Sequence, residues 1–435
     1  MARDTALDTA RVQQVARDVA QAVGRVIEAE MLQWGMQGGR DLAHMEQWVQ
    51  SVVGQVGRLL LQGGVRVVRA ETERPRGCAC GERMQSLGMR ERRVVTVVGE
   101  VPLRRRYYYC RECGAGVHAA DGALGLDGGM TSPGVRAALG LVAALLPMRR
   151  AVQALGLVGP VRLSASTCRR VARELGERAQ GQKVPRQVPA LQRGEKLYLA
   201  MDGTCVWTQE GWREAKAAVY YQVKPGADGE LEAARHPSYV AGLEAAEAFG
   251  ERVYAEGQWR GAANGGLRGA LGDGAAWIWN QVELHFPGAV QVVDWYHASE
   301  RIRQVGMKLY GEGTARCTQW VEERLDALWE QGPAPVRRSL ERLRPAGREA
   351  EEAVRQAVVY FRNNAARMQY PQLRRRRHPV GSGPVETACK YLIGARCKQP
   401  GMRWSLGGLK AILCLRTAFF NDYYEELIHA LPAAA

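Results

Sequence analysis

The stretch KLYLAMDG, residues 196–203, carries the strongest indication of the fold. Its apolar residues from Leu197 to Met201 form an unbroken run, which is typical of a strand that is buried on both faces of a sheet. The run leads directly to Asp202 and Gly203, so we expect the strand to end at Asp202. Ligand and metal sites gather at such strand ends in α/β sheets.

The chain after this stretch alternates between strand and helix patterns, which predicts a mixed α/β sheet. The pattern predicts further strands at 212–223, 236–243, 267–273 and 289–294, with helices at 243–256 and 275–286 between them. Two of these strands are expected to end at an aspartate, Asp273 in LRGALGDG and Asp294 in AVQVVD. From residue 298 to about 377 the pattern is helical and highly charged, and a final pair of helices begins near Val385 and continues over 406–429.

The N-terminal part of the chain has a different texture. Residues 1–64 place apolar side chains such as Val12, Val15 and Val19 at helical spacing, which favours packing or self-association. Residues 65–120 contain short Val-rich and Tyr-rich runs and predict a small β unit. Residues 130–182 return to helix, with Ser164 or Ser166 placed to cap the last one, an arrangement compatible with a helix-turn-helix. A linker, GQKVPRQVP (181–189), separates this part from the predicted sheet.

Four cysteines bracket the predicted β unit as two close pairs, Cys78-x-Cys80 and Cys110-x2-Cys113. Two pairs separated by a short β segment supply four thiolates at tetrahedral corners, as in a zinc ribbon with a structural Zn2+ site. The first pair is one residue tighter than the usual spacing, and His118 could replace one ligand. The alternative is a set of small buried cysteines, which is weakened because the other six cysteines show no comparable pairing.

The chain of 435 residues has 60 Lys and Arg against 45 Asp and Glu, a net charge of +15, which favours an anionic partner such as nucleic acid. Arg104, Arg105 and Arg106 stand beside three tyrosines, a composition that suits phosphate contact and base stacking, although a solvated charged face is the plain alternative. No secretory pattern follows Met1, and the longest apolar region (137–148) is too short to span a bilayer. We therefore expect a cytoplasmic protein without membrane contact.

Three carboxylates are the candidate catalytic groups: Asp202, Asp273 and Glu386, the last in the first turn of a helix that opens at GSGPVETACK. Each has an ordinary explanation, because Asp before Gly is a common turn and a glutamate complements a helix dipole. Together they can hold two divalent cations about 4 Å apart, which activate a nucleophile and stabilise a leaving oxygen.

A second acidic motif, Asp294-Trp-Tyr-His297, follows the next predicted strand. Asp294 and His297 are three residues apart on an emerging helix and therefore share a face, where they could position each other, a metal or a phosphate. The alternative is a helix-capping aspartate with a half-buried histidine. The run Arg374–Arg377 brings positive charge close to Glu386 in the sequence, or else forms a solvated loop.

Four of these motifs also carry a family resemblance. MDGT at Asp202, GDGAAWIW at Asp273, FPGAVQVVDWYHASE at Asp294 and GSGPVETACKYLIGARCKQPGMRWS at Glu386 resemble bacterial insertion-sequence transposases of the ISKra family, relatives of the Mutator-like superfamily. The resemblance runs in order across about residues 65–425. It departs from the family at Cys78-Ala-Cys80, where similar proteins have Cys-x2-Cys. It implies an RNase H-like fold whose acidic triad carries out two-metal phosphoryl transfer on DNA.

The resemblance assigns Asp202 as the first acid of the triad and Glu386 as the last. In the superfamily the second acid precedes a helix and a strand that lead to a Cys or Asp and then a His. Here Asp273 precedes the predicted helix 275–286 and strand 289–294, which lead to Asp294 and His297. The resemblance therefore assigns Asp273 as the second acid. Asp294 and His297 then become accessory residues, with Asp294 the second choice as a metal ligand. The charged helices of 301–378 resemble an all-α insertion, which divides the catalytic domain into 194–300 and 379–430.

The sequence thus predicts a multidomain α+β protein with N-terminal helices, a zinc ribbon, a helix-turn-helix region and an RNase H-like α/β domain with an all-α insertion. Its predicted function is that of a DNA transposase that binds element ends and acts on double-stranded DNA. The predicted cofactors are two Mg2+ (or Mn2+) ions at the active site and one structural Zn2+. We expect the protein to act as a homodimer or larger assembly in the bacterial cytoplasm, at the nucleoid. Candidate DNA contacts are Arg104, Arg105, Arg106, Arg169, Arg170, Arg374, Arg375, Arg376, Arg377, Lys390, Lys398 and Arg403. A catalytically silent DNA-binding repressor or domesticated transposase, and a nuclease without strand transfer, are the competing predictions.

Overall fold

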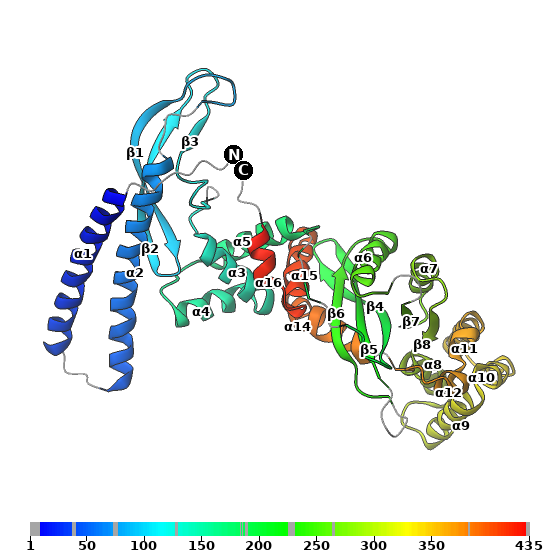
Figure 1. Ribbon diagram of the computed structural model, residues 1–435. Helices are drawn as coiled ribbons and strands as arrows, with labels where there is room; N and C mark the ends of the chain where they lie inside the picture. The colour runs from blue at the N-terminus through cyan, green and yellow to red at the C-terminus, as the bar shows by residue number, and fades with distance from the viewer. Residues whose placement is uncertain are drawn as a thin grey trace. The chain divides into compact units, whose positions relative to one another are not determined.

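The computed structural model describes residues 9–36, 41–72, 77–126, 129–182, 184, 186–187, 190–224, 231–262, 266–381 and 383–431 (Figure 1). The chain divides into two compact units, residues 1–182 with 425–435 and residues 183–424. Each unit contains its own β-sheet, so the expected multidomain α+β class is confirmed at that level.

The first unit begins with two long helices, α1 (Thr9–Met36) and α2 (Leu42–Thr72), that pack against each other. A Cβ atom on Gly63 of α2 would come within 2.6 Å of the Val19 side chain, so this glycine permits the close approach of the helices. The predicted helical region ends at residue 64, whereas α2 continues to Thr72. The extra turns are stabilised because Val65 packs against the buried core of the neighbouring β unit.

That β unit is an antiparallel sheet of β1 (Gln85–Thr96), β2 (Gly99–Tyr109) and β3 (Gly116–His118), in that order. Its core consists of Val94, Val101, Leu103 and Leu126. Alternate residues of β2 point inward, as expected for a sheet with one buried face.

Three helices complete the first unit's middle part: α3 (Pro133–Leu145), α4 (Met148–Val158) and α5 (Ala165–Ala179), each in contact with the other two. Ser164 Oγ accepts a hydrogen bond from the Thr167 amide at 3.1 Å, which confirms the expected cap of the last helix. The short helix α16 (Tyr424–Ala430) lies almost wholly in this unit, in which Leu427 is buried.

The second unit is built on a five-stranded sheet with the strand order β6-β5-β4-β7-β8. Its strands are β4 (Lys196–Thr208), β5 (Gly211–Val223), β6 (Arg235–Gly242), β7 (Leu267–Gly272) and β8 (Val290–Val293). β4, β5 and β6 pair antiparallel, whereas β4, β7 and β8 run parallel to one another. The central strand β4 is buried from Leu197 to Met201, as its apolar run predicts.

One strand boundary differs from the prediction. β4 does not end at Asp202 but continues to Thr208, because Thr204–Thr208 keep pairing with β5 up to a tight turn that closes at the Thr208–Gly211 pair. The parallel neighbour β7 pairs with β4 only as far as Ala200. Asp202 therefore lies inside a long strand, yet beyond the last residue pair that joins β4 to β7.

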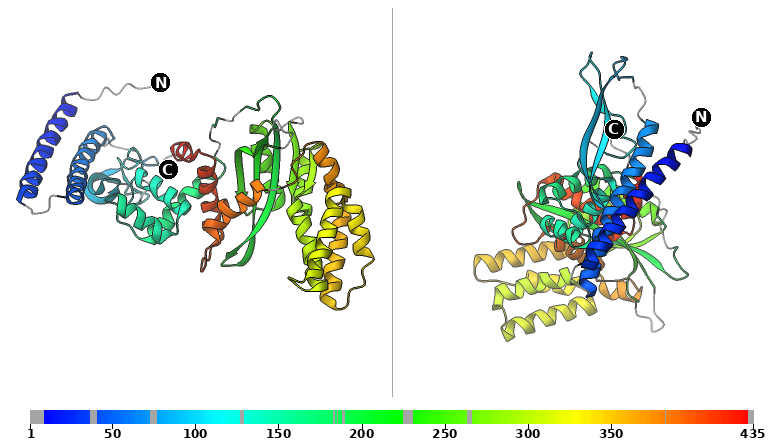
Figure 2. Two further views of the ribbon diagram at one scale, coloured as in Figure 1. Left: turned by 90° about the horizontal axis from the view of Figure 1, so that it is seen from below. Right: turned by 90° about the vertical axis from the view of Figure 1, so that its left-hand side faces the viewer.

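Helices surround this sheet: α6 (Ala246–Trp259), α7 (Ala276–His285), α8 (Trp295–Tyr310), α9 (Ala315–Gln331), α10 (Pro333–Glu341), α11 (Arg348–Asn363), α12 (Tyr370–Arg375), α13 (Gly383–Thr387), α14 (Ala395–Cys397) and α15 (Leu406–Phe420). A 3-10 turn covers Ala365–Met368, and a π-helical segment covers Ala388–Gly394. Residues 298–377 are all described and contain no strand, as predicted. Helices α8–α11 pack together as one group, while α15 packs beside β6 (Figure 2).

In the part of the chain that the structure describes, the helices lack the combination of length and apolar character needed to cross a membrane.

The junction of α15 with the edge strand β6 supplies a test of this packing. The Asn421 side chain accepts a hydrogen bond from the Tyr239 amide at 2.7 Å and donates one to the Tyr239 carbonyl at 2.9 Å. We predict that Asn421→Ala lowers the free energy of unfolding by about 1–3 kcal/mol, because two backbone groups lose their partners. Asn421→Asp should cost more than alanine, since it also places a charge against a carbonyl. Urea unfolding measures both, with exposed Gln258→Ala as the control that should stay within about 0.5 kcal/mol.

Candidate functional site

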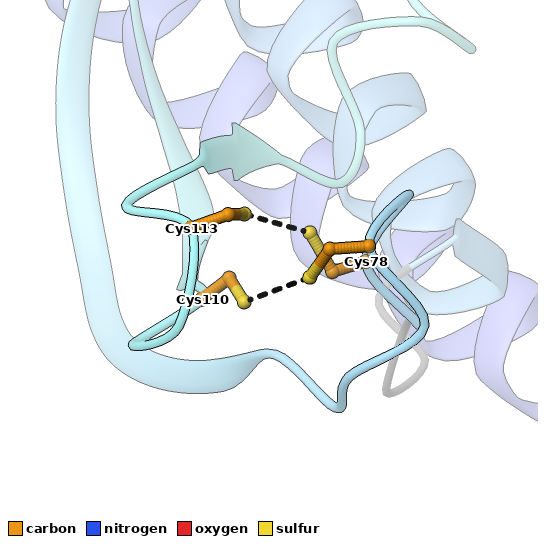
Figure 3. Close-up of side chains that lie close together, drawn as sticks. Cys78, Cys110 and Cys113 are labelled. Atoms are coloured by element: carbon orange, nitrogen blue, oxygen red, sulfur yellow. Dashed lines mark hydrogen bonds between the residues drawn. The ribbon is translucent and has the colours of Figure 1, made fainter.

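Four cysteines of the first unit form a compact cluster, Cys78, Cys80, Cys110 and Cys113 (Figure 3). The Cys78 and Cys113 sulfurs are 3.3 Å apart, those of Cys80 and Cys110 are 3.6 Å apart, and all four lie within 4.8 Å of one another. These separations exceed a disulfide bond of about 2.05 Å. They are close to the sulfur spacing of about 3.8 Å that a tetrahedral site with Zn–S bonds of about 2.3 Å requires.

The cluster has the chemistry of a metal site. The Cys80 backbone amide and the neighbouring thiols form hydrogen bonds to Cys78 that lower the pKa of its thiol to about 7, so a thiolate is available near neutral pH. The expected gathering of the four cysteines is confirmed, and they could hold a metal such as zinc. His118 is not part of the cluster. Its ring packs against that of Tyr107 of β2 instead, with 5.0 Å between the ring centres and an angle of 49° between the ring planes.

In the second unit, three aspartates lie in a row just beyond the last residue pairs that join the parallel strands β4, β7 and β8. Ala200 of β4 pairs with Leu271 of β7, and Leu271 pairs with Val292 of β8. Asp202, Asp273 and Asp294 each come two residues after one of these paired positions. Because side chains alternate along a strand, equal offsets place the three aspartates at the same level of the sheet edge.

Asp202 is half-buried and shares its surroundings with three other groups. Its carboxylate accepts hydrogen bonds from the Gly203 amide at 2.7 Å and from the Cys389 thiol, and it is close enough to Asp273 for their charges to repel. Burial, with the Asp273 charge adding to it, raises the pKa of Asp202. Among the described residues, neither Asp202 nor Asp273 forms an ion pair with Lys or Arg. This donor set suits divalent cations, which prefer carboxylate oxygens and relieve such repulsion.

Asp273 is held by the turn that follows β7. Its carboxylate accepts a hydrogen bond from the Ala275 amide at 2.8 Å, and its carbonyl accepts one from the Tyr360 hydroxyl of α11 at 2.7 Å. Gly274 has a positive φ of 101°, and a Cβ atom there would come within 2.7 Å of the Tyr360 ring. The Asp-Gly pair therefore serves both the turn and the close approach of α11.

Asp294 is fully buried and caps α8 by accepting hydrogen bonds from the Tyr296 and His297 amides. Its carboxylate is 3.7 Å from His297 Nδ1, within ion-pair range but too long for a hydrogen bond. This contact with Asp294 raises the pKa of His297, and the charges of Asp202 and Asp273 raise it further. Partial burial of the ring acts in the opposite direction and lowers the pKa, but the raising effects are larger. The predicted Asp294–His297 pairing is thus present, with Asp294 also in the capping role.

Glu386 is exposed in α13, which packs against β4 and β5. It lies three residues before Cys389, the thiol that contacts Asp202, so the two side chains emerge on neighbouring positions of one helix. Among the described residues only the cysteine cluster brings three or more ligand atoms within 4.8 Å of one another. Asp202 and Asp273 are therefore close enough to interact electrostatically, Glu386 lies on a helix that packs on β4, and the three acids do not form a closed cage of metal ligands.

Sequence reasoning did not identify Cys389 as a neighbour of Asp202. Burial and the nearby carboxylate raise the pKa of the Cys389 thiol, so it stays protonated and can donate to Asp202. Cys389 is the second residue of the π-helical segment Ala388–Gly394, and such segments are rare but frequent at functional sites. The spacing of three residues between Glu386 and Cys389 was the only available indication in the sequence.

The candidate basic residues fall into two groups. Arg105 is buried and paired with Asp121, and Arg374 stacks on Trp329 with its guanidinium 4.0 Å from the ring centre. The prediction that Arg105 contacts DNA is therefore wrong, because its charge is neutralised inside the β unit, and Arg374 serves packing. The remaining candidates have at least part of their side chains accessible: Arg104, Arg106, Arg169, Arg170, Arg375, Arg376, Arg377, Lys390, Lys398 and Arg403. Lys398 lies beside the acids, donating to Thr204 Oγ1 at 2.9 Å.

Comparison with known protein families gives one match. The sequence model of an uncharacterised protein family, UPF0236, matches residues 36–425, so the chain belongs to this family. No curated protein matches the chain.

Metal content tests the cysteine cluster directly. Protein purified without chelator should contain about one zinc per chain, because four thiolates close a structural site. Cys113→Ser should lower the zinc content well below that value. Cys205→Ser is the matched control, since Cys205 is an exposed cysteine of β4 outside the cluster, and it should leave the zinc content unchanged. Zinc-free wild-type protein would contradict the assignment.

Thermal unfolding tests the acidic site. The raised pKa of Asp202 means that the folded state holds this proton more tightly than the unfolded state, so the ionised carboxylate destabilises the fold above its folded-state pKa. In chelator at pH 7 we predict that Asp202→Asn unfolds at a higher temperature than wild type, and that the gain disappears as the pH falls below the ordinary pKa of aspartate. Mg2+ should raise the unfolding temperature of wild type and not of the variant. Exposed Asp326→Asn on α9 is the control, and a wild type indifferent to Mg2+ would count against a cation site.

Proposed function

We propose that this protein is a DNA transposase of an insertion sequence, of the kind found in the ISKra family. The observation that carries the proposal is the placement of Asp202 and Asp273 at the same level of two adjacent parallel strands, with the helix of Glu386 packed on one of them. A pair of neighbouring carboxylates that forms no ion pair with Lys or Arg among the described residues suits two-metal phosphoryl transfer. The quoted motifs around these residues support the same class.

The topology of the second unit supports an RNase H-like domain for this function. Its sheet begins with three antiparallel strands, β4, β5 and β6, and continues with the parallel strands β7 and β8 on the other side of β4. The helices α8–α12 follow the last strand and separate it from the helix of Glu386 in the sequence, which is the place of the proposed all-α insertion.

The structure favours Asp273 over Asp294 as the second metal ligand. Asp294 is fully buried and its Oδ1 accepts both capping hydrogen bonds of α8, so this oxygen is already engaged within the protein. Asp273 is only partly buried and interacts electrostatically with Asp202. Asp294 is then a positioning residue for His297, and the raised pKa of this histidine favours its protonated form close to the two carboxylates.

Each residue has a defined task in the proposed reaction. Mg2+ bound by Asp202, Asp273 and Glu386 would activate water or a 3′-hydroxyl for attack on phosphorus and stabilise the leaving oxygen. The Cys389 thiol and the Gly203 amide orient the Asp202 carboxylate through their hydrogen bonds. The Ala275 amide and the Tyr360 hydroxyl fix Asp273 in its turn. Lys398, next to Thr204 on β4, offers a cation for a phosphate close to the acids.

The first unit would recognise the element ends. The cysteine cluster would hold Zn2+ as the anchor of a zinc ribbon, while α4 and α5 would form the helix-turn-helix, with the exposed Arg169 on α5. The helices α1 and α2 expose apolar side chains such as Leu32, Val53 and Leu60, which supports association of two chains on paired ends. We propose that the enzyme acts as a homodimer or larger on double-stranded DNA, in the bacterial cytoplasm at the nucleoid.

Cleavage of DNA tests the proposal. Wild-type protein should cut DNA that carries the sequences flanking its gene in a Mg2+-dependent manner. Asp202→Asn, Asp273→Asn and Glu386→Gln should each reduce the cleavage rate by at least about 100-fold, because an isosteric amide removes a charged ligand, and all three should keep DNA binding. Asp294→Asn should retain measurable cleavage, since it keeps one oxygen for the cap of α8.

The competing functions predict different results. Cleavage without joining of the cut end to a second DNA would indicate a nuclease. Binding without any cleavage by wild type would indicate a repressor or a domesticated transposase. An inactive Asp294→Asn beside an active Asp273→Asn would reverse the assignment of the second ligand.

A further inference from the structure

A polar groove of about 510 Å³ lies directly beside the acidic site, between α7, α8 and α11. Gly274, the residue that follows Asp273, forms one end of its lining, and Tyr360, whose hydroxyl holds the Asp273 carbonyl, forms part of its wall. The groove is lined by none of the proposed metal ligands and by none of the candidate basic DNA contacts. A molecule bound in it would nevertheless touch the turn that carries Asp273.

The charge of the groove favours an anion. Its lining includes Arg301, Arg355 and Arg367 but no Asp or Glu. Arg355 pairs with Glu352, and Arg367 pairs with Glu283, whereas Arg301 forms no ion pair within the described residues and donates only to the Gln304 side chain at 3.3 Å. One exposed guanidinium therefore remains uncompensated. The adjacent groove between α8 and α11, which Arg301 also lines, is different because Glu349 and Glu352 line it and Glu349 pairs there with Lys308.

One buried hydrogen-bond donor next to the groove lacks a partner among the described residues. Trp279 is 97% buried, since its exposed fraction is 3%, and its indole Nε1 has no hydrogen-bond partner among the described residues although Trp279 lines the groove. The exposed Asn280 and Asn363 line the same groove. An unsatisfied buried donor is costly, so its presence in a polar groove indicates a ligand that accepts hydrogen bonds.

We propose that this groove binds the sugar-phosphate backbone of the DNA strand next to the scissile phosphate. A phosphate accepts hydrogen bonds from a guanidinium and from side-chain amides at once, and it neutralises the free charge of Arg301. The half-buried ring of Tyr360 also lines the groove, with the Arg301 guanidinium 5.3 Å from the ring centre. This inference rests on the proposed function, because it names the place of the substrate strand at that same site.

The test is the salt dependence of DNA binding, measured by fluorescence anisotropy of a labelled duplex of the gene-flanking sequence in chelator, between about 50 and 200 mM NaCl. Loss of one phosphate contact should reduce the slope of log K against log salt by about 0.9. We expect this reduction for Arg301→Ala. Asn363→Ala should weaken binding without changing the slope, since it removes a neutral donor. Arg303→Ala is the matched control, because Arg303 is exposed on the same helix but does not line the groove.

Four outcomes separate the possibilities. A wild-type slope for Arg301→Ala, or an equal reduction for Arg303→Ala, would overturn the proposal. Binding of inorganic phosphate but not of DNA in the groove would also overturn it. In that case phosphate would raise the unfolding temperature of wild type, Arg301→Ala would abolish this rise, and the salt slope of DNA binding would be the same for both proteins. Because no cleavage occurs in chelator, a wild type that shows the Arg301 effect but never cuts DNA with Mg2+ would support the groove and contradict the transposase function.

Discussion

The parallel pairing of β4, β7 and β8 is the constraint on which the candidate active site depends. It sets Asp202, Asp273 and Asp294 at equal offsets from the paired residues Ala200, Leu271 and Val292. A shift of one residue in either register would turn one aspartate to the opposite face of the sheet. The register is maintained by the burial of β4 on both faces and by Gly272 of β7, where a Cβ atom would come within 2.9 Å of Ile278. The geometry of the acids is therefore a consequence of how the core of the second unit packs.

Close carboxylates oppose folding, and the surrounding residues reduce that cost. The raised pKa of Asp202 records the combined effect of burial and the neighbouring Asp273. The protonated Cys389 thiol, the Gly203 amide and the His297 ring each stabilise the ionised form in part. Such an arrangement is unfavourable for stability alone and is typical of sites that bind cations or react. Asp294, in contrast, is satisfied by the cap of α8, which is why its full burial is tolerated.

Sequence patterns predicted those features that depend on neighbouring residues. The strand of Leu197–Met201, the cap by Ser164 and the two cysteine pairs all rest on local spacing, and the structure agrees with each. Features that depend on distant contacts were less accessible. The extension of β4 to Thr208 follows from its pairing with β5, and the extension of α2 to Thr72 follows from the packing of Val65 on the β unit. The burial of Arg105 depends on Asp121, which no basic-residue pattern reveals. The contact of Cys389 with Asp202 likewise required the fold.

We infer that Asp202 and Asp273 bind a divalent cation together. Anomalous scattering from crystals of the protein grown with Mn2+ tests it most directly, because Mn2+ takes the same oxygen ligands as Mg2+ and can be located without reference to activity. The account predicts a manganese peak between the Asp202 and Asp273 carboxylates that is absent from crystals of Asp202→Asn. A peak at Asp294 without one at Asp273, or an acidic site that remains metal-free at millimolar Mn2+, would contradict it.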